Sequence, residues 1–157
     1  MRILVLSDSH GNTAVLRKAI LAQGEAKHIF FLGDNIRDIE AVRADFLDRT
    51  FYAVSGNCDF GSVTPSNDIA EVCGIKILYT HGHSFYVKQS LVPLRDVAKK
   101  RNIKIALFGH THIPVTLYED GVWLVNPGSV SQPRDGRPSY AVIDIEQNGI
   151  MPIIVNL

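Results

Sequence analysis

The feature of this sequence that most restricts its fold is a series of short apolar runs, each followed by a polar cluster. The runs are four or five residues long and rich in β-branched and aromatic residues, which is typical of strands. Their apolar residues are continuous, so we expect strands buried on both faces. The runs are RILVL (2–6), HIFFL (28–32), FYAV (51–54), KILYT (76–80), KIALF (104–108) and VWLV (122–125).

Helical spacing of apolar residues separates the first three runs. The signals are Val15, Leu16, Ala19 and Ile20 after a cap at Asn12 or Thr13, then Ile39, Val42 and Phe46, and later the segment 93–101 with a proline in its first turn. Strands that alternate with helices predict a parallel sheet with right-handed crossovers.

The second half of the chain carries hairpin signals instead. Asp120-Gly121 and Asn148-Gly149 each lie between two apolar runs, and Cys73-Gly74 is a third candidate turn. We therefore expect a largely antiparallel carboxyl half, and an α/β architecture in which two sheets pack together with helices outside.

Composition favours one domain over residues 1–157 and restricts its partners. The 16 basic and 16 acidic residues balance, so nothing favours nucleic acid. No apolar run approaches the roughly 20 residues that cross a bilayer, and the two cysteines form no Cys-x-x-Cys pair. We expect a cytoplasmic protein with no membrane partner. Unpaired strand edges in the carboxyl half leave a homo-oligomer open.

Polar side chains follow five of the predicted strands, and five of the six histidines lie in these clusters. Because ligands bind outside the carboxyl ends of strands in α/β sheets, we expect the clusters to converge. Taken singly, each residue has an ordinary interpretation, such as a helix cap at Asp8 or a turn at Asp34. Together, buried carboxylates and imidazoles need a counter-charge, and one or two divalent cations would supply it. The candidates are Asp8, His10, Asp34, Asn57, Cys58, Asp59, His81, His83, His110 and His112.

The same clusters form an ordered set of motifs: DSH at Asp8, GDN at Asp34, GNCD at Asn57, HGH at His81 and GHTH at His110. This set resembles the calcineurin-like metallophosphoesterase superfamily, and the resemblance extends to NPGS at 126–129. The short chain, the GNCD variant and NPGSVSQPR more narrowly resemble the small bacterial and archaeal phosphodiesterases of that superfamily.

The resemblance implies a four-layer αββα sandwich of two mixed sheets flanked by helices, with two divalent ions. We expect Mn²⁺, with Ni, Zn, Co, Fe or Mg as alternatives. The first ion is expected on Asp8, His10 and His112, the second on Asn57, His81 and His110, with Asp34 between them. The implied activity is that of a metal-dependent phosphodiesterase acting on a small phosphodiester, in which a metal-bridging hydroxide attacks phosphorus.

Residues beside the expected ions are candidates for catalysis and substrate binding. Asp34, Asn57, Cys58 and His83 are the catalytic candidates, and Asn57, His83 and Arg134, with Arg137 nearby, are the substrate-binding ones. Many members of the superfamily have histidine where this chain has Cys58, and a thiol matches proton transfer near neutral pH less well. We therefore expect a preference for diesters or activated aryl esters. Cys58 as a small packed residue, His83 as a loop hydrogen-bond partner and the arginines as solvated surface charges remain open alternatives.

Two other functions remain open from sequence. The fold resembles that of a retromer scaffold subunit, so a protein-binding scaffold with little or no turnover is the main alternative. A metal hydrolase acting on a bond other than a phosphate ester is the second. The complete set of expected ligand positions favours the phosphodiesterase.

Overall fold

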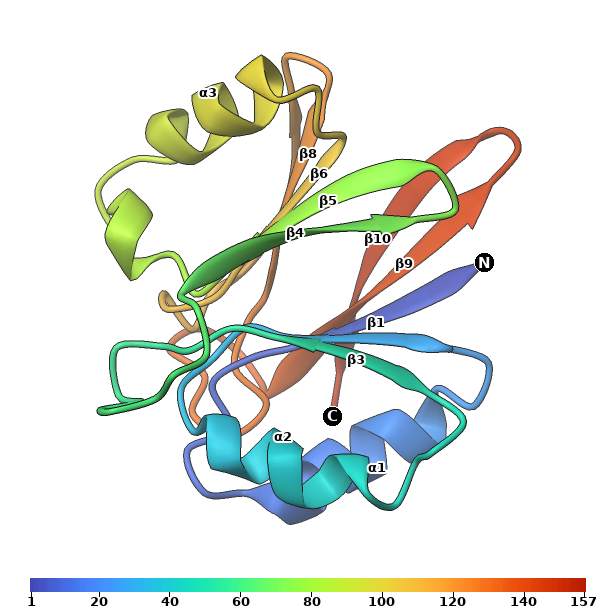
Figure 1. Ribbon diagram of the computed structural model, residues 1–157, viewed down its shortest axis with the longest axis vertical. Helices are drawn as coiled ribbons and strands as arrows, with labels where there is room; N and C mark the ends of the chain where they lie inside the picture. Colours follow the sequence, from blue (N-terminus) through green and yellow to red (C-terminus); the bar gives the residue numbers. More distant parts are fainter.

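Two five-stranded sheets pack face to face in the computed structural model, which describes residues 1–157 (Figure 1). The first sheet has the strand order β10-β9-β1-β2-β3. Its strands are β1 (Arg2–Leu6), β2 (His28–Phe31), β3 (Thr50–Ala53), β9 (Ser139–Glu146) and β10 (Gly149–Asn156). β1 pairs in parallel with β2, and β2 with β3, whereas β9 is antiparallel to both β1 and β10.

The second sheet has the order β4-β5-β6-β8-β7. It contains β4 (Asn67–Val72), β5 (Ile75–Thr80), β6 (Ile105–Phe108), β7 (Pro114–Glu119) and β8 (Val122–Pro127). The central strands β5, β6 and β8 are parallel, and antiparallel strands β4 and β7 form the two edges.

Three helices cover the outer faces of the two sheets. α1 (Thr13–Ala22) and α2 (Ile36–Arg43) lie on the first sheet, and α3 (Val92–Lys100) lies on the second (Figure 1). A short 3₁₀ turn, η1 (His83–Phe85), follows β5. None of the helices combines the length and hydropathy that crossing a lipid bilayer requires.

The layers are held by three apolar clusters. Phe30, Tyr79 and Leu107 belong to the cluster between the sheets, Leu16 and Phe31 to the one under α1 and α2. The third cluster packs α3 against the second sheet. The predicted four-layer sandwich is therefore confirmed, with each sheet burying apolar side chains on both faces.

Several local predictions need correction. Phe46 lies beyond α2, which ends at Arg43, and it packs on the core from the following turn. β3 is an edge strand and is only partly buried. The last hairpin turns at residues 147–148, one residue before the predicted Asn-Gly pair, because Gly149 pairs with Glu146. The carboxyl half is less antiparallel than expected, since the centre of the second sheet is parallel.

Candidate metal centre

The loops after β1, β2, β3, β5 and β6 meet at one edge of the sandwich and bring seven predicted ligand residues together. These strands run parallel within their sheets, so their carboxyl ends face the same way. The first sheet contributes the loops with Asp8, His10, Asp34 and Asn57, and the second contributes those with His81, His110 and His112.

One group of donors consists of Asp8, His10, Asp34 and His112. One ligand atom from each lies within 4.8 Å of all the others. His112 Nε2 is 3.1 Å from Asp8 Oδ1 and 3.4 Å from His10 Nε2. His10 Nε2 is 3.9 Å from Asp34 Oδ2. This is the spacing of groups that can share one cation.

A second group of donors lies on the other side of Asp34. His81 Nε2 is 3.1 Å from Asn57 Oδ1, 3.2 Å from His110 Nδ1 and 3.5 Å from Asp34 Oδ1. The two carboxylate oxygens of Asp34 therefore face the two groups separately, Oδ2 toward His10 and Oδ1 toward His81.

Hydrogen bonds to backbone carbonyls orient two of the imidazoles. His81 Nδ1 is 2.7 Å from the carbonyl of Leu32, and His112 Nδ1 is 2.7 Å from that of Gln132. A carbonyl only accepts, so both Nδ1 atoms carry hydrogen and the Nε2 atoms of both rings face into the site. Such backbone partners are usual for metal-binding histidines.

Acceptor atoms of several side chains therefore converge on the site. Asp8 Oδ1 is buried, and His112 Nε2 lies 3.1 Å from it. Around His81 Nε2, the carboxylate of Asp34 and the amide oxygen of Asn57 are also acceptors. Either added protons or cations can relieve this arrangement, and mixed nitrogen and oxygen donors suit divalent transition metals. The residues present therefore fit metal ions.

The electrostatics without a cation show the same demand for positive charge. Burial opposes ionisation of Asp8, yet its hydrogen bond with His112 and the charge of His81 hold its pKa below the ordinary value. The Asp8 carboxylate in turn raises the pKa of His112, against the effect of burial. Burial and the charge of His81 lower the pKa of His110 to about 4, so its lone pair stays free near neutral pH.

Backbone conformation at the site is unusual. Asp8, His10, Asp34, His110 and His112 all have positive φ, between 45° and 67°. Non-glycine residues in this region cost on the order of 1–3 kcal/mol each, and such strain concentrates at functional sites. Five of the seven donors therefore keep conformations that only the surrounding contacts can hold.

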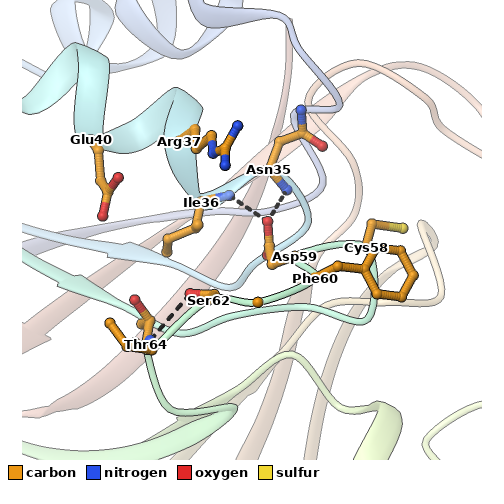
Figure 2. Close-up of a pocket in the computed structure, with 11 residues that line it drawn as sticks. Asn35, Ile36, Arg37, Glu40, Cys58, Asp59, Phe60, Ser62 and Thr64 are labelled. Atoms are coloured by element: carbon orange, nitrogen blue, oxygen red, sulfur yellow. Dashed lines mark hydrogen bonds between the residues drawn. The ribbon is translucent and has the colours of Figure 1, made fainter.

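Two carboxylates outside the seven donors, the half-buried Asp59 and the buried Asp38, hold these loops. Asp59 accepts hydrogen bonds from the backbone N–H groups of Asp34, Asn35, Ile36 and Gly56, at 2.7–3.0 Å. Figure 2 shows those from Asn35 and Ile36. Asp38, on α2, accepts from the Ser9 hydroxyl at 2.7 Å and from the Gly11 N–H at 2.8 Å. Asp59 was quoted in GNCD, whereas nothing local in the sequence signals Asp38.

The NPGS segment supports the same loops from the side of β8. Ser129 donates to the carbonyl of Asp8 at 2.8 Å, and Ser131 donates to that of Ser9 at 2.8 Å. The Asn126 amide donates to the Gly109 carbonyl at 2.9 Å and to the Thr111 hydroxyl at 3.0 Å. These residues position the strand ends that carry Asp8 and His110.

The remaining predicted residues lie around the seven donors. The Cys58 N–H donates to Asp34 Oδ1 at 2.9 Å, and the exposed thiol has a pKa raised to about 11 by partial desolvation and by Asp34. The ring of His83 is centred 5.5 Å from that of His81; its Nδ1 is buried without a partner, and burial lowers its pKa.

The two arginines differ. Arg134 is exposed, and its backbone N–H donates to the carbonyl of His112 at 3.2 Å, which places it beside the donors. Arg137 is exposed and makes no side-chain hydrogen bond or ion pair. Of the two, only Arg134 is tied to the site.

A pocket of about 460 Å³ adjoins the second donor group at Cys58. Figure 2 shows its wall, formed by the start of α2 and by the loop that follows Asn57. The exposed ring of Phe60 lies on the same side as the Cys58 sulfur, and Arg37 and Glu40 project from α2 (Figure 2). The pocket offers both polar and aromatic contacts beside Asp34.

The fold and the two donor groups define an α/β sandwich protein with a candidate metal centre between its sheets. Comparison with known proteins identifies the family. The family model for the calcineurin-like phosphoesterase superfamily domain matches residues 1–148 of the sequence. The chain therefore belongs to this superfamily, as its motifs predicted.

Similar proteins come from several organisms. The chain is 33% identical to the probable metallophosphoesterase YsnB of Bacillus subtilis, over 94% of this chain and 86% of that protein. It is 27% identical to the phosphodiesterase YfcE of Escherichia coli K12, over 98% and 91% of the two chains.

Solved structures share the fold. A predicted phosphoesterase from Streptococcus pneumoniae TIGR4 superposes with a TM-score of 0.83 at 28% identity, covering 99% of this chain and 88% of that one. A Vps29 mutant from Entamoeba histolytica has a TM-score of 0.77 at 20% identity, covering 100% and 99%.

Proposed function

We propose that this protein is a metal-dependent phosphodiesterase that holds two divalent ions, one on each side of Asp34. The observation that supports this proposal most is that Asp34 lies between the two groups of donors, with Oδ2 toward His10 and Oδ1 toward His81. Asp8, His10 and His112 would hold one ion, and Asn57, His81 and His110 the other. Mn²⁺ is the first candidate, since carboxylate, amide and imidazole donors are all present.

When bound, two divalent ions acidify water to near neutral pH and stabilise negative charge on a phosphoryl group. Asp34, with one carboxylate oxygen toward each donor group, would hold both ions. Asn57 is a neutral donor, so the site keeps more positive charge than a third carboxylate would leave, which favours an anionic phosphate ester. The half-buried imidazole of His83, whose pKa burial lowers, would be available to donate a hydrogen bond to a phosphoryl oxygen.

Two observations favour diesters over monoesters. Cys58 keeps its proton near neutral pH, because its pKa is about 11, and it is a poor donor to the leaving oxygen of an alkyl monoester. The pocket at Cys58 also gives room for an organic group beside the phosphoryl site. The relationship to the phosphodiesterase YfcE supports the same choice.

The test is hydrolysis of bis(4-nitrophenyl) phosphate and 4-nitrophenyl phosphate by chelator-stripped protein reloaded with Mn²⁺, Ni²⁺, Zn²⁺, Co²⁺ or Mg²⁺. We expect metal-dependent cleavage of the diester in preference to the monoester, abolished in Asp34→Asn. Cys58→His should raise monoester turnover relative to diester turnover. Asp45→Asn, on an exposed carboxylate paired with Arg17, is the matched control.

A scaffold role is the second candidate, because Vps29 shares the fold. A scaffold does not need the full set of donors, and this chain has all seven in place. Two bound ions per chain with no cleavage of either ester would favour the scaffold and contradict the phosphodiesterase.

A further inference from the structure

A second pocket, of about 340 Å³, lies beside the loop after β6, which carries His110 and His112. Its lining differs in chemical character from that of the pocket at Cys58. Its floor is apolar and includes Val87, Leu91, Phe108 and Ile113. Lys88 and Arg134 are its two charged lining residues, and no acidic side chain lines it. The volume is within the range of small-molecule sites.

The segments that build this pocket are the segments that carry the candidate ligands. Val87 and Lys88 follow η1, in the loop that begins at His81. Thr111 lines the pocket and lies between His110 and His112. The pocket is thus joined to both donor groups through short stretches of backbone.

Arg134 is held in place by the site itself. Its N–H donates to the carbonyl of His112, and the neighbouring Gln132 carbonyl accepts from the Nδ1 of the same histidine. The backbone of Arg134 is therefore anchored beside a candidate ligand, and its side chain lines the pocket.

Neither cation of the pocket is neutralised. Lys88 and Arg134 are exposed and form no ion pair, so no carboxylate offsets either charge. Two free cations over an apolar floor attract an amphiphilic anion.

We propose that this pocket binds one organic arm of the substrate, and that this arm is apolar or aromatic and carries a negative charge of its own. The inference rests on the phosphodiesterase function proposed above and names its substrate class: a phosphodiester with a further carboxylate, sulfonate or phosphate on one arm. Val87, Leu91, Phe108 and Ile113 contact the apolar part, and Lys88 and Arg134 contact the added anion.

The pocket at Cys58 is not expected to prefer a negatively charged arm. It is lined by both Arg37 and Glu40, so opposite charges are present at its wall. We assign the charged arm to the Lys88 pocket and the other arm to the Cys58 pocket.

Binding is tested without turnover, on chelator-stripped protein. The probe is 1-anilinonaphthalene-8-sulfonate, an aromatic anion, compared with N-phenyl-1-naphthylamine, which lacks the sulfonate. We expect fluorescence titration to show about tenfold weaker binding of the sulfonate in the double variant Lys88→Ala/Arg134→Ala, with little change for the neutral probe. The control Lys18→Ala/Arg43→Ala removes the same charges from α1 and α2.

Kinetics test the assignment to substrate. With Mn²⁺ present, KM for an aryl diester that carries a carboxylate on one ring should rise several-fold in Lys88→Ala, while KM for bis(4-nitrophenyl) phosphate changes little. Equal effects on both diesters, or equal loss of sulfonate binding in the control variant, would overturn the inference and leave the phosphodiesterase function standing. Charge-dependent probe binding without cleavage of any diester would overturn the proposed function and the substrate assignment with it.

Discussion

Asp59 shows how a residue outside the donor set controls it. Its carboxylate accepts four backbone N–H groups, from the turn that carries Asp34 and from Gly56, which precedes Asn57. These contacts join the loops after β2 and β3, and one of them satisfies the first N–H group of α2, that of Ile36. Asp59 thus fixes the turn that carries Asp34, and the Cys58 N–H holds Oδ1 of its carboxylate.

We expect Asp59→Ala to destabilise the protein by about 3 kcal/mol and to weaken Mn²⁺ binding by at least about tenfold, because four partly buried donors lose a charged acceptor. Urea denaturation measures the first effect and calorimetric titration with Mn²⁺ the second. Asp45→Ala, at an exposed carboxylate, should change neither by much. Unaltered Mn²⁺ affinity in Asp59→Ala would show that Asp34 is positioned by other contacts.

The sequence predicted that the seven candidate donors would lie together, but it did not predict that Asp59 and Asp38 hold their loops. The reason is physical. The seven donors follow strands, and strand ends of a parallel sheet meet whatever the loops do in detail. Asp59 acts on residues 23–25 positions earlier in the chain, and Asp38 acts on a loop 27–29 positions earlier. Such contacts depend on loop conformations with positive φ, which no local pattern indicates.

At the scale of elements, β1 and β6 meet at Gly109, just beyond the end of β6. A Cβ at this position would collide with the Ser7 hydroxyl and lie 3.0 Å from Asp8 Oδ2. The two sheets therefore approach closely where each delivers a candidate ligand.

We expect Gly109→Ala to cost about 2 kcal/mol through overpacking and to weaken Mn²⁺ binding by displacing Asp8. The cost should be smaller in a Ser7→Ala background, since the nearest colliding atom is then absent. Denaturation of the two single variants and the double variant measures this coupling. Gly24→Ala is the control, because a Cβ there meets no atom within 4 Å. Additive costs at Gly109 and Ser7 would contradict the proposed collision.

A second prediction at this scale concerns the pairing of β1 with β9. Arg2 and Asp144 are opposite each other in register and form two hydrogen bonds, of 2.9 and 2.8 Å. The Arg2 hydrogen bond, against partial desolvation, holds the pKa of Asp144 below its ordinary value. A depressed carboxyl pKa contributes stability above the unfolded value of about 3.9, and this contribution is lost as pH falls through the folded value.

We therefore expect Asp144→Asn to cost about 1 kcal/mol at pH 7, with the same cost at pH 5 and a smaller one below about pH 4. The free energy of unfolding of wild type and variant across this range measures the difference. A double-mutant cycle with Arg2→Gln separates the pair from the single charges. A cost that stays constant down to pH 3 would exclude the ion pair as its source.

The elements themselves were predictable where a local signal specifies them. Asp120-Gly121 and Cys73-Gly74 turn as expected, with all four residues at positive φ. The apolar runs did not predict the parallel pairing of β5, β6 and β8. A run such as 104–108 indicates a buried strand, but it does not indicate the partner or direction of that strand. Pairing partners are set by packing over the whole molecule.

At the scale of the whole molecule, the donors divide between the sheets. Asp8, His10, Asp34 and Asn57 come from the first sheet and His81, His110 and His112 from the second, so ions bound here would join the two halves of the sandwich. At the interface between the sheets, the buried Asp8 Oδ1 lies 3.1 Å from His112 Nε2. Ion binding and stability of the fold should therefore be linked.

We expect chelator-stripped protein to melt at a lower temperature than protein with Mn²⁺. One site at 100 times its Kd adds about 2.7 kcal/mol, which for a chain of this size is a shift of about 5–10 °C. Calorimetric scans with and without Mn²⁺ measure it. Asp34→Asn should lose most of the shift, since both donor groups share this carboxylate, whereas Asp48→Asn, at an exposed carboxylate near Lys27, should keep it. Identical melting temperatures with and without Mn²⁺ in the wild type would mean that the sheets are not joined through these donors.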